Sequence, residues 1–399
     1  MAARMNGDGK ILGEPIVLDT TMISFFANNK IYNVLYSEDK QRIAIYKLHN
    51  KGEQQYIFSC SLFDGSMNVI SAYTATIPMQ QHNAVLTEFS LDNEGWMVFV
   101  KAAGNADNNN LQDISLMVKD PHSETLSNYP LDIGNVFLDD IRVKIDNRNK
   151  HFLVAAFYAK QKKGNIDGLF CAMWDKNTTT VQVARKIVFN DELKSNAKSE
   201  GSSRSAFNDF FLQNIFVLKD GGFAIAAESA YSSSRGVYNS RWDYMYNSPY
   251  WYNSNSYLYG SSYGYSYYPW MSPYGYGSQS TRYYADNIAV ISFDSAANMQ
   301  WASIIPKSQY DDNSDNFIGY GIYVTSGQVN FLFNQFQKRT LLLQAQSIDA
   351  TGKVTLTPTL KELDKGYQFM PRYAKQVSGR EVLLPCQYRN YLCFAKIEF

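Results

Sequence analysis

Short apolar runs of five to nine residues recur along the whole chain, and turns rich in Gly, Asp and Asn separate them. Within many of these runs apolar and polar residues alternate, whereas the 3.6-residue spacing of an amphipathic helix is nearly absent. Alternation bounded by turn residues is typical of β-strands that bury one face. The sequence therefore predicts an all-β fold of short antiparallel strands.

The strand pattern itself repeats. Each unit begins with Asn, Asp or Gln, runs into a first strand and reaches a tight polar turn about ten residues later. Successive starts are separated by 54, 52, 74, 107 and 52 residues, and the two long spacings contain a polar stretch (190–208) and a Tyr-rich segment (231–284). The six starts are Asn29, Asn83, Asn135, Asp209, Asn316 and Gln368.

Each complete unit is expected to hold four strands. In the third unit they are Phe137–Ile145, His151–Ala159, Gly168–Trp174 and Thr180–Phe189. The turn between the third and fourth strands usually begins with Asp, because an Asp side chain accepts hydrogen bonds from the backbone of a tight turn. The turn-leading residues are Asp64, Asp120, Asp175, Asp294 and Asp349.

Four-stranded units repeated four to eight times predict a β-propeller. We expect a single domain spanning 10–399 with six blades; seven or five blades would follow from a different count in the first or fourth unit. The sixth unit ends after three strands, and residues 8–19 resemble the fourth strand of the fifth unit at 350–361. The N-terminal strand is therefore expected to complete the last blade and close the ring.

Loop lengths differ between the two faces of such a ring. The turns that join first to second and third to fourth strands share one face and are all short, whereas the second-to-third loops and the inter-unit links share the other face and carry all the extra length. Loops on a rigid scaffold commonly carry function. The long-loop face is therefore the expected functional face, although insertions also accumulate wherever they are tolerated.

The Tyr-rich segment 231–284 is an insertion within blade four and holds 16 of the 30 tyrosines and three of the six tryptophans. Tyr and Trp offer broad contact area at low entropic cost, while Ser, Gly and Asn adapt to a partner. This composition favours a binding surface, and a low-complexity, self-packing flap is the alternative. The candidate ligand-binding aromatic residues are Trp242, Trp251, Tyr259, Tyr265 and Trp270.

The polar residues that start the units would ring the entrance of a central channel. Asn83, Asp209 and Asn316 are therefore candidate ligand-binding residues, and a strand-entry hydrogen bond repeated in every unit is the structural alternative. Glycosidases use two carboxyl groups as acid and base, so carboxylates near this entrance leave a glycan hydrolase or lyase open. The acid and base would come from Asp139, Asp140, Asp209 or Asp315.

One short run carries a weak metal signal. Asp311, Asn313 and Asp315 alternate as the first ligands of a calcium loop do, but the Gly at the sixth position and the Glu at the twelfth are missing. Turn-forming side chains are the alternative, and no other cofactor is expected. The four histidines are scattered, and the chain lacks a P-loop, a dinucleotide fingerprint and a nucleophile elbow. No catalytic residue is assigned, and an enzyme is the less favoured interpretation.

Charge and hydropathy exclude several partners. The 37 basic and 37 acidic residues balance, so there is no footprint for nucleic acid. No apolar run approaches the roughly 18 residues of a membrane span. The N-terminus has no apolar signal region but begins at the expected domain edge, so we expect an export signal to have been removed ahead of it.

The four cysteines have no metal-binding spacing. Cys386 and Cys393 flank a predicted tight turn at Arg389–Asn390, which would put them on facing strands. A cross-strand disulfide and a pair of buried thiols acting as small hydrophobic groups both remain open.

Four segments, at 198–211, 219–229, 281–294 and 363–399, carry a resemblance that extends over nearly the whole chain. They resemble an uncharacterised family of envelope or secreted proteins of Gram-negative bacteria, which has a propeller-like repeat and a Tyr/Gly-rich insertion. The resemblance implies an export signal and a periplasmic or extracellular location. It implies no catalytic residues.

These observations favour a non-enzymatic binding or scaffolding module of the bacterial envelope. Its partner would be a protein or an envelope glycan held on the long-loop face. The alternatives are a propeller hydrolase or lyase that uses paired Asp residues near the channel, and a structural surface protein that associates with itself through the insertion.

Overall fold

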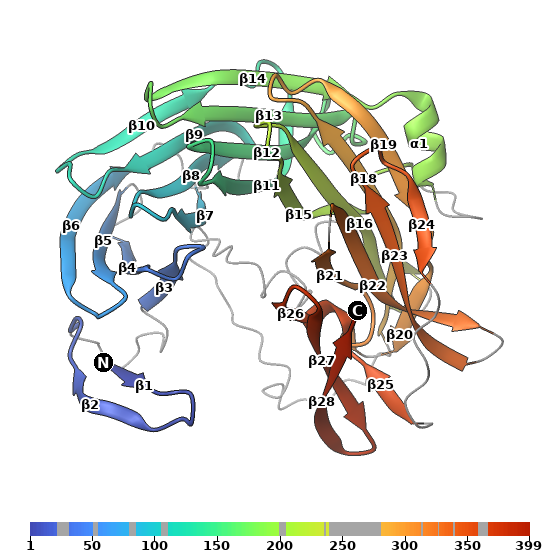
Figure 1. Ribbon diagram of the computed structural model, residues 1–399. Coiled ribbons are helices and arrows are strands. Elements are labelled where there is room, and N and C mark those ends of the chain that lie inside the picture. Colours follow the sequence, from blue (N-terminus) through green and yellow to red (C-terminus); the bar gives the residue numbers. More distant parts are fainter. Residues whose placement is uncertain are drawn as a thin grey trace, which may run out of the picture.

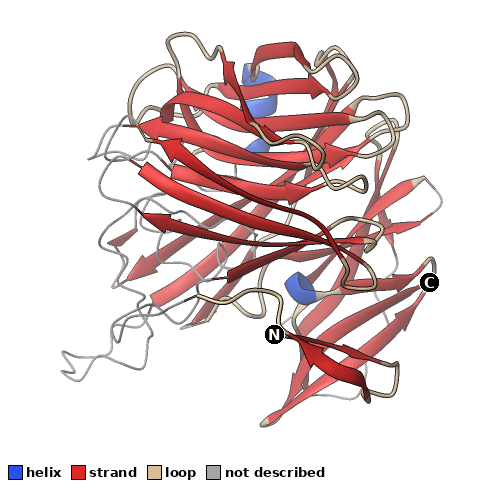
Figure 2. Ribbon diagram, turned by 90° about the vertical axis from the view of Figure 1, so that its left-hand side faces the viewer, coloured by secondary structure: helices blue, strands red, loops and turns tan. Residues whose placement is uncertain are grey.

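The computed structural model describes residues 1–21, 32–50, 55–79, 85–104, 111–198, 205–234, 237–238, 281–312, 314–325, 327–337, 340–357 and 366–399. Nearly all regular structure within these ranges is β-strand, as predicted. Figure 2 shows the strands in red and two short helical segments in blue, α1 (Asp191–Ala197) and the 3-10 helix η1 (Pro371–Tyr373). Neither helix has the length and apolarity needed to cross a membrane.

The strands form successive antiparallel units in chain order. Unit 1 contains β3 (Tyr32–Tyr36), β4 (Arg42–Asn50), β5 (Gln55–Asp64) and β6 (Val69–Pro78). Unit 2 contains β7 (Val85–Leu91), β8 (Met97–Gly104), β9 (Leu111–Lys119) and β10 (Leu126–Leu131). Unit 3 contains β11 (Phe137–Asp146), β12 (His151–Ala159), β13 (Gly168–Asp175) and β14 (Thr180–Val188). The four strands predicted for unit 3 agree with these bounds to within one residue.

The second half of the chain continues the pattern. Unit 4 contains β15 (Phe210–Val217), β16 (Phe223–Ser234), β18 (Thr281–Phe293) and β19 (Met299–Ile305), with β17 (Val237–Tyr238) and β20 (Gln309–Asp312) at its edges. Unit 5 contains β21 (Tyr320–Thr325), β22 (Gln328–Gln337), β23 (Thr340–Asp349) and β24 (Val354–Thr357). Unit 6 contains β25 (Tyr367–Phe369), β26 (Lys375–Ser378), β27 (Glu381–Tyr388) and β28 (Tyr391–Glu398).

The units follow one another along an arc. Figure 1 shows the first strands, such as β3, β7 and β11, on the inside and the fourth strands, such as β6, β10 and β14, on the outside. Meanders arranged radially in this way are propeller-like.

Neighbouring units share hydrophobic cores. Because side chains alternate between the two faces of a strand, one strand can serve two cores. In β8, Val98 and Val100 pack towards unit 3, whereas Met97 and Phe99 pack towards unit 1. Across the described residues five such cores join each unit to the next. The packing between units is therefore what holds the arc together.

The sheet faces at the two ends of the arc remain exposed. In unit 1, Val34 and Tyr36 are 57% and 60% exposed. In unit 6, Leu392 and Phe394 are 65% and 69% exposed. Exposed apolar faces of this kind mark interaction surfaces.

The predicted Asp-led turns are confirmed. Asp64 Oδ1 accepts hydrogen bonds of 2.8 Å from the backbone N–H groups of Ser66 and Asn68. Asp294 Oδ1 accepts the same pair, from Ala296 at 2.9 Å and Asn298 at 2.8 Å. Asp120, Asp175 and Asp349 act in the same way in their units. A local side-chain to backbone bond is why this position could be identified from the sequence.

The N-terminal strand pairs differently from the prediction. β2 (Ile11–Ile16) forms a separate hairpin with β1 (Ala2–Met5), and within the described residues β28 pairs only with β27. The hairpin turn is held by Asn6, whose Oδ1 accepts from the backbone N–H groups of Asp8 at 3.0 Å and Lys10 at 2.9 Å. A favourable local turn thus competes with pairing at the far end of the chain.

The sequence pattern predicts three strands in unit 6, the first of them at Pro371–Gln376, and the structure differs at this strand. Residues 371–376 do not form one strand: Pro371–Tyr373 is a 3-10 turn, and β25 and β26 pair with the two ends of β27 on either side of it. Pro371 lacks a backbone N–H and fits the first turn of a helix better than a strand interior. The polar stretch 190–208 likewise contains α1, whose first turn is capped by Asn190 Oδ1 accepting from Leu193 N–H at 2.8 Å.

Candidate functional site

Two long strands carry the base of the Tyr-rich insertion. β16 and β18 pair from Phe223–Phe293 to Ser234–Thr281, whereas the pairing of β18 with β19 stops at Ile288–Ile305. Beyond that point β20 pairs with β18 and β17 pairs with β16. The result is a four-stranded ribbon on the long-loop side of unit 4, and we call its described residues 230–234, 237–238, 281–287 and 309–312 the stem.

A row of tyrosines crosses the stem. Tyr231 lies opposite Tyr284, and Tyr284 lies opposite Tyr310. The rings of Tyr231 and Tyr284 stack with centroids 4.6 Å apart and planes 12° apart, and Tyr310 is 6.5 Å from Tyr284. Aromatic pairs directly opposite each other stabilise a sheet by up to about 1 kcal/mol each. The row therefore stiffens the stem while leaving Tyr310 48% exposed.

The next row on the same face holds an ion pair. Arg282 donates to Asp312 twice, from Nε to Oδ1 at 2.7 Å and from Nη2 to Oδ2 at 3.1 Å. The guanidinium carbon lies 4.5 Å from the ring centroid of Tyr310. Its hydrogen bonds to Asp312 hold the pKa of that carboxyl below its usual value. The bidentate Arg282–Asp312 pair and the exposed ring of Tyr310 therefore present fixed polar groups and an aromatic surface side by side.

The opposite face of the stem holds a carboxyl group that, unlike that of Asp312, is partly buried and has a raised pKa. Asp311 is half-buried, and its Oδ2 is buried without a hydrogen-bond partner within the described residues. Burial raises the pKa of Asp311 to about 6. Burial also raises the pKa of Tyr283, which lies opposite Asp311. This face is the more buried of the two, because Tyr283 and Asp311 are half-buried whereas Arg282 and Asp312 are exposed.

The predicted calcium run lies beside this face. Asp315 is buried and accepts from Arg372 Nη1 at 2.6 Å, so its charge is already balanced by a cation from unit 6. Asn313 lies outside the described residues, and the described part of the chain contains no group of three or more His, Cys, Asp or Glu that could hold a metal. Calcium binding at Asp311, Asn313 and Asp315 stays a prediction.

The candidate channel residues do not share one environment. Asp209 is half-buried at the foot of the stem, where it lines a cavity of about 20 Å³ with Tyr231 and Asp286. Tyr231 donates its hydroxyl hydrogen to Asp286 Oδ2 at 3.0 Å. Such a cavity can hold about one water molecule. Asn316 is exposed and accepts from the hydroxyl of Tyr373 at 3.1 Å. Asn83 lies outside the described residues.

The carboxylate of Asp140, one of the candidate acids or bases, holds two units together. Leu212 of unit 4 donates its backbone N–H to Asp140 Oδ2, and Arg142 Nε lies 3.4 Å from Asp140 Oδ1. Glu88 makes the equivalent contacts one unit earlier: it accepts from the backbone N–H of Val143 at 3.2 Å and lies 3.3 Å from Arg142 Nη1. We call these carboxylate contacts between inner strands staples.

Both staple carboxylates sit in bulges of their inner strands. Glu88 and Asp140 have φ angles of 58° and 53°, and the pairing register shifts at each of them. A bulge turns one side chain away from the regular alternation of the strand. Here it directs a carboxylate to the next unit, so Asp140 has a structural role. Asp139 is buried next to it in β11.

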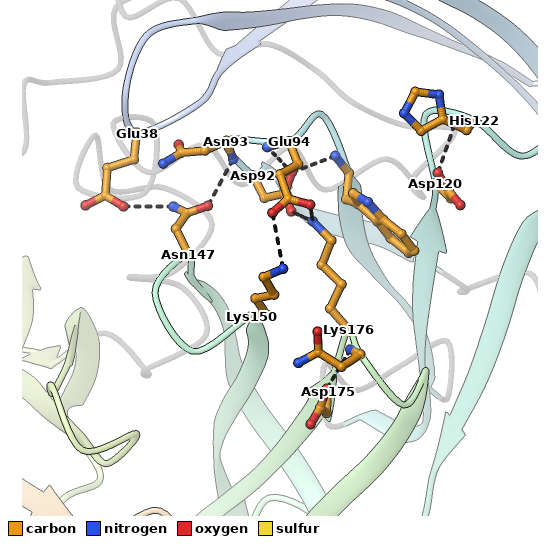
Figure 3. Close-up of polar contacts among 12 residues, drawn as sticks. Glu38, Asp92, Asn93, Glu94, Asp120, His122, Asn147, Lys150, Asp175 and Lys176 are labelled. Carbon is orange, nitrogen blue, oxygen red and sulfur yellow. Dashed lines mark hydrogen bonds and ion pairs between the residues drawn. The ribbon is translucent and has the colours of Figure 1, made fainter.

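The short-turn face carries a second polar network, shown in Figure 3. Asn93 of unit 2 donates its backbone N–H to Asn147 Oδ1 of unit 3 at 2.9 Å, and Asn147 Nδ2 donates to Glu38 Oε2 of unit 1 at 2.8 Å. Lys176 Nζ lies 2.5 Å from Asp92 and 2.9 Å from Glu94 Oε2. These hydrogen bonds connect the turns of units 1, 2 and 3, so the network has a structural role.

The polar and aromatic groups of the stem were not predicted from the sequence. Arg282 and Asp312 are 30 residues apart, and only the pairing of β18 with β20 brings them together. The available signal was the mixture of polar and aromatic residues in 281–284 and 309–312, which lie outside the strands Phe223–Ala230 and Asn287–Phe293 that the apolar pattern predicts. The aromatic candidates of the insertion lie outside the described residues: Trp242, Trp251, Tyr259, Tyr265 and Trp270.

Comparison with known proteins gives no family. No family model matches the chain, and no curated protein matches it. Among solved structures, a Synechocystis apocarotenoid oxygenase mutant aligns with 92% of this chain at 10% identity and a TM-score of 0.38, and this chain spans 64% of its length. A GH43 β-1,3-galactosidase aligns with 84% of this chain and 93% of its own at 9% identity and a TM-score of 0.30.

A third solved structure is an exo-1,5-α-L-arabinanase from a bovine ruminal metagenomic library. It aligns with 82% of this chain and 96% of its own length, at 12% identity and a TM-score of 0.32. At TM-scores this low the activities of these proteins carry no conclusion for this chain.

Proposed function

We propose that this protein is a non-enzymatic binding or scaffolding module of the bacterial envelope and that it holds a protein or glycan partner on its long-loop face. The observation that carries the proposal is the stem. It gives the Tyr-rich insertion a four-stranded base, whereas the chain could have crossed between β16 and β18 in a few residues.

A rigid base favours binding because ordering a loop at the moment of association costs free energy. The stem orders the residues next to the insertion in advance through the Tyr231–Tyr284 stack and the Arg282–Asp312 pair. The short-turn face lacks this arrangement, since the described polar groups of its turns bond to one another. The two faces therefore differ in the groups that they can offer to a partner.

The carboxylates also support binding over hydrolysis. Of the four proposed acids or bases, Asp139 is buried. Asp140 contacts Arg142 and the backbone of Leu212, and Asp315 pairs with Arg372. Asp209 lines a cavity of about 20 Å³, far smaller than a sugar ring needs. A glycosidase requires one carboxyl able to donate a proton and one to act as base or nucleophile beside an open site.

A replacement of residues 239–280 by a short Gly-Ser linker tests the binding proposal. The stem residues stay, so the variant is expected to keep the melting temperature of the intact chain and to lose retention of its partner. The probe is a Gram-negative envelope extract, applied with and without protease treatment to separate protein from glycan partners. Lys150→Ala, on the exposed short-turn face, is the matched control and should bind as the intact chain does.

Equal retention by both chains would contradict the proposal. Release of reducing sugar that disappears in an Asp209→Asn variant would favour the hydrolase instead. Oligomers that dissociate when residues 239–280 are replaced, measured by light scattering, would favour self-association.

We also propose that the arc is a six-bladed ring, closed by packing unit 6 on unit 1 with β2 as the outer strand of unit 6. Six units share five cores, and the two end faces expose apolar residues such as Tyr36 and Phe394. Burying a face of this kind stabilises a fold by about 25 cal/mol per Å². All side chains of β2 are exposed, as expected of a strand that would be buried only after pairing with unit 6.

Removal of residues 1–21 tests the closure. If β2 completes unit 6, the truncated chain should melt several degrees below the intact one and bind more of a dye that reports exposed apolar surface. Removal of residues 1–7 alone keeps β2 and should change neither property. An unchanged melting temperature after the longer truncation would show that β2 forms only its local hairpin.

A further inference from the structure

The last hairpin of the chain places two thiols face to face. In the register of β27 and β28, Cys386 lies directly opposite Cys393. The two-residue turn between Tyr388 and Tyr391 fixes this register, with Arg389 at a φ of 53° as such tight turns require. Both thiols are free, Cys386 is buried and Cys393 is partly exposed. They share the sheet face that also carries Leu384 and Ala395.

The backbone spacing at this pair suits a disulfide. Tyr388 and Tyr391 flank the two-residue turn and so form a hydrogen-bonded pair; because such pairs alternate along antiparallel strands, Cys386 and Cys393 form another. A hydrogen-bonded pair has its Cα atoms about 5.5 Å apart, within the range of about 4.4–6.8 Å found in disulfides. Burial and the neighbouring thiol of Cys393 raise the pKa of Cys386, which agrees with this closeness.

The other two cysteines have different surroundings. Cys171 lies within the core between units 3 and 4, and Cys60 faces Tyr73 across β5 and β6. Burial raises the pKa of both thiols to about 12, so very little of either is present as the reactive thiolate at neutral pH. They serve as internal controls for the reactivity of the pair in the hairpin.

We propose that Cys386 and Cys393 form an intrachain disulfide in the folded protein when it meets an oxidising thiol–disulfide couple. The thiolate of Cys393, the more exposed of the two, attacks a disulfide such as oxidised glutathione and releases one glutathione thiolate. The thiolate of Cys386 then attacks the Cys393 sulfur and releases the second. The two protein thiols give up two protons and two electrons, and glutathione disulfide takes up both electrons.

The bond would fasten the end of the sheet. β28 is an edge strand whose described pairing is with β27 alone, and its outer face exposes Leu392 and Phe394. Until β2 completes unit 6 as proposed above, this apolar edge strand can pair with other chains. A covalent link across the hairpin keeps β28 on β27 in an oxidising compartment such as the periplasm or the cell exterior. This inference does not depend on what the long-loop face binds.

The experiment incubates the native protein with oxidised and reduced glutathione, blocks remaining thiols with a maleimide after denaturation and counts them by mass spectrometry. We expect two blocked thiols instead of four, a peptide map that links 386 to 393, and full reversal by dithiothreitol. Cys386→Ser and Cys393→Ser should each abolish the link, whereas a Cys60→Ser/Cys171→Ser chain should keep it.

Stability gives a second measurement. The oxidised intact chain should melt above the reduced one, and Cys386→Ser should melt at one temperature under both conditions. Four blocked thiols in the native protein under oxidising conditions would overturn the proposal. A link that involves Cys60 or Cys171, or one that forms only after denaturation, would overturn it as well.

Discussion

Replacing Lys307 by Met is expected to lower the free energy of unfolding by about 3–5 kcal/mol, because it leaves the carboxylate of Glu228 buried without its cation. Both side chains are 0% exposed, and Lys307 Nζ lies 2.7 Å from Glu228 Oε1. The ammonium also donates to the backbone oxygen of Ala285 at 2.8 Å and to Gln309 Oε1 at 2.9 Å. Burial lowers the pKa of Lys307, and the attraction of Glu228 opposes that shift.

Urea denaturation of the single and double variants measures this effect. The Glu228→Gln/Lys307→Met double variant should be more stable than Lys307→Met alone, because it removes the uncompensated charge together with its partner. Lys396→Met, which changes an exposed pair in unit 6, is the surface control and should shift the urea midpoint far less. A single variant as stable as the intact chain would show that Glu228 does not depend on Lys307.

Replacing Arg142 by Met is expected to cost a similar amount, about 3–5 kcal/mol, since one guanidinium serves two staple carboxylates. It lies within 3.4 Å of Asp140 Oδ1 and 3.3 Å of Glu88 Oε1, and its Nε donates to the backbone oxygen of Leu212 at 3.0 Å. Without it, two nearly buried carboxylates face each other across the inner strands of units 2 and 3. The loss should appear as weaker contact between units 2, 3 and 4.

The measurement combines urea denaturation with hydrogen exchange. The backbone N–H groups of Val143 and Leu212 donate to the carboxylates of Glu88 and Asp140. We expect both amides to exchange faster in Arg142→Met than in the intact chain. Arg148→Met, in the exposed turn after β11, is the matched control and should leave both amides protected. Equal protection in the two variants would contradict a shared role of Arg142 in the staples.

The repeat and most strand limits were predictable because their causes are local. Alternating side chains define a strand, and a turn such as that at Asp294 is closed by the residue's own side chain. For this reason the predicted strand His151–Ala159 matches β12 to the residue. The order of the units then follows from their order in the chain.

The site could not be predicted in the same way because its contacts are not local. Nothing in the sequence assigns Arg282 to Asp312, and the apolar pattern ended the strands before the stem began. Asp140 was a candidate acid or base because the repeat pattern places its carboxylate near the expected channel. The sequence does not show that this carboxylate accepts a hydrogen bond from the backbone N–H of Leu212. The N-terminal hairpin depends on the balance between two pairings of β2, which a pattern cannot weigh.

The contacts between neighbouring turns bear on how the repeat could have arisen by duplication. Asp39 donates its backbone N–H to Asn93, and Asn93 does the same to Asn147, each across 54 positions. A gene segment duplicated at that period would bring along both the amide that donates and the side chain that accepts, so each new copy would fit its predecessor at once. Extra length can then be added outside the inner strand and its turn, as it is at the crossing from β16 to β18.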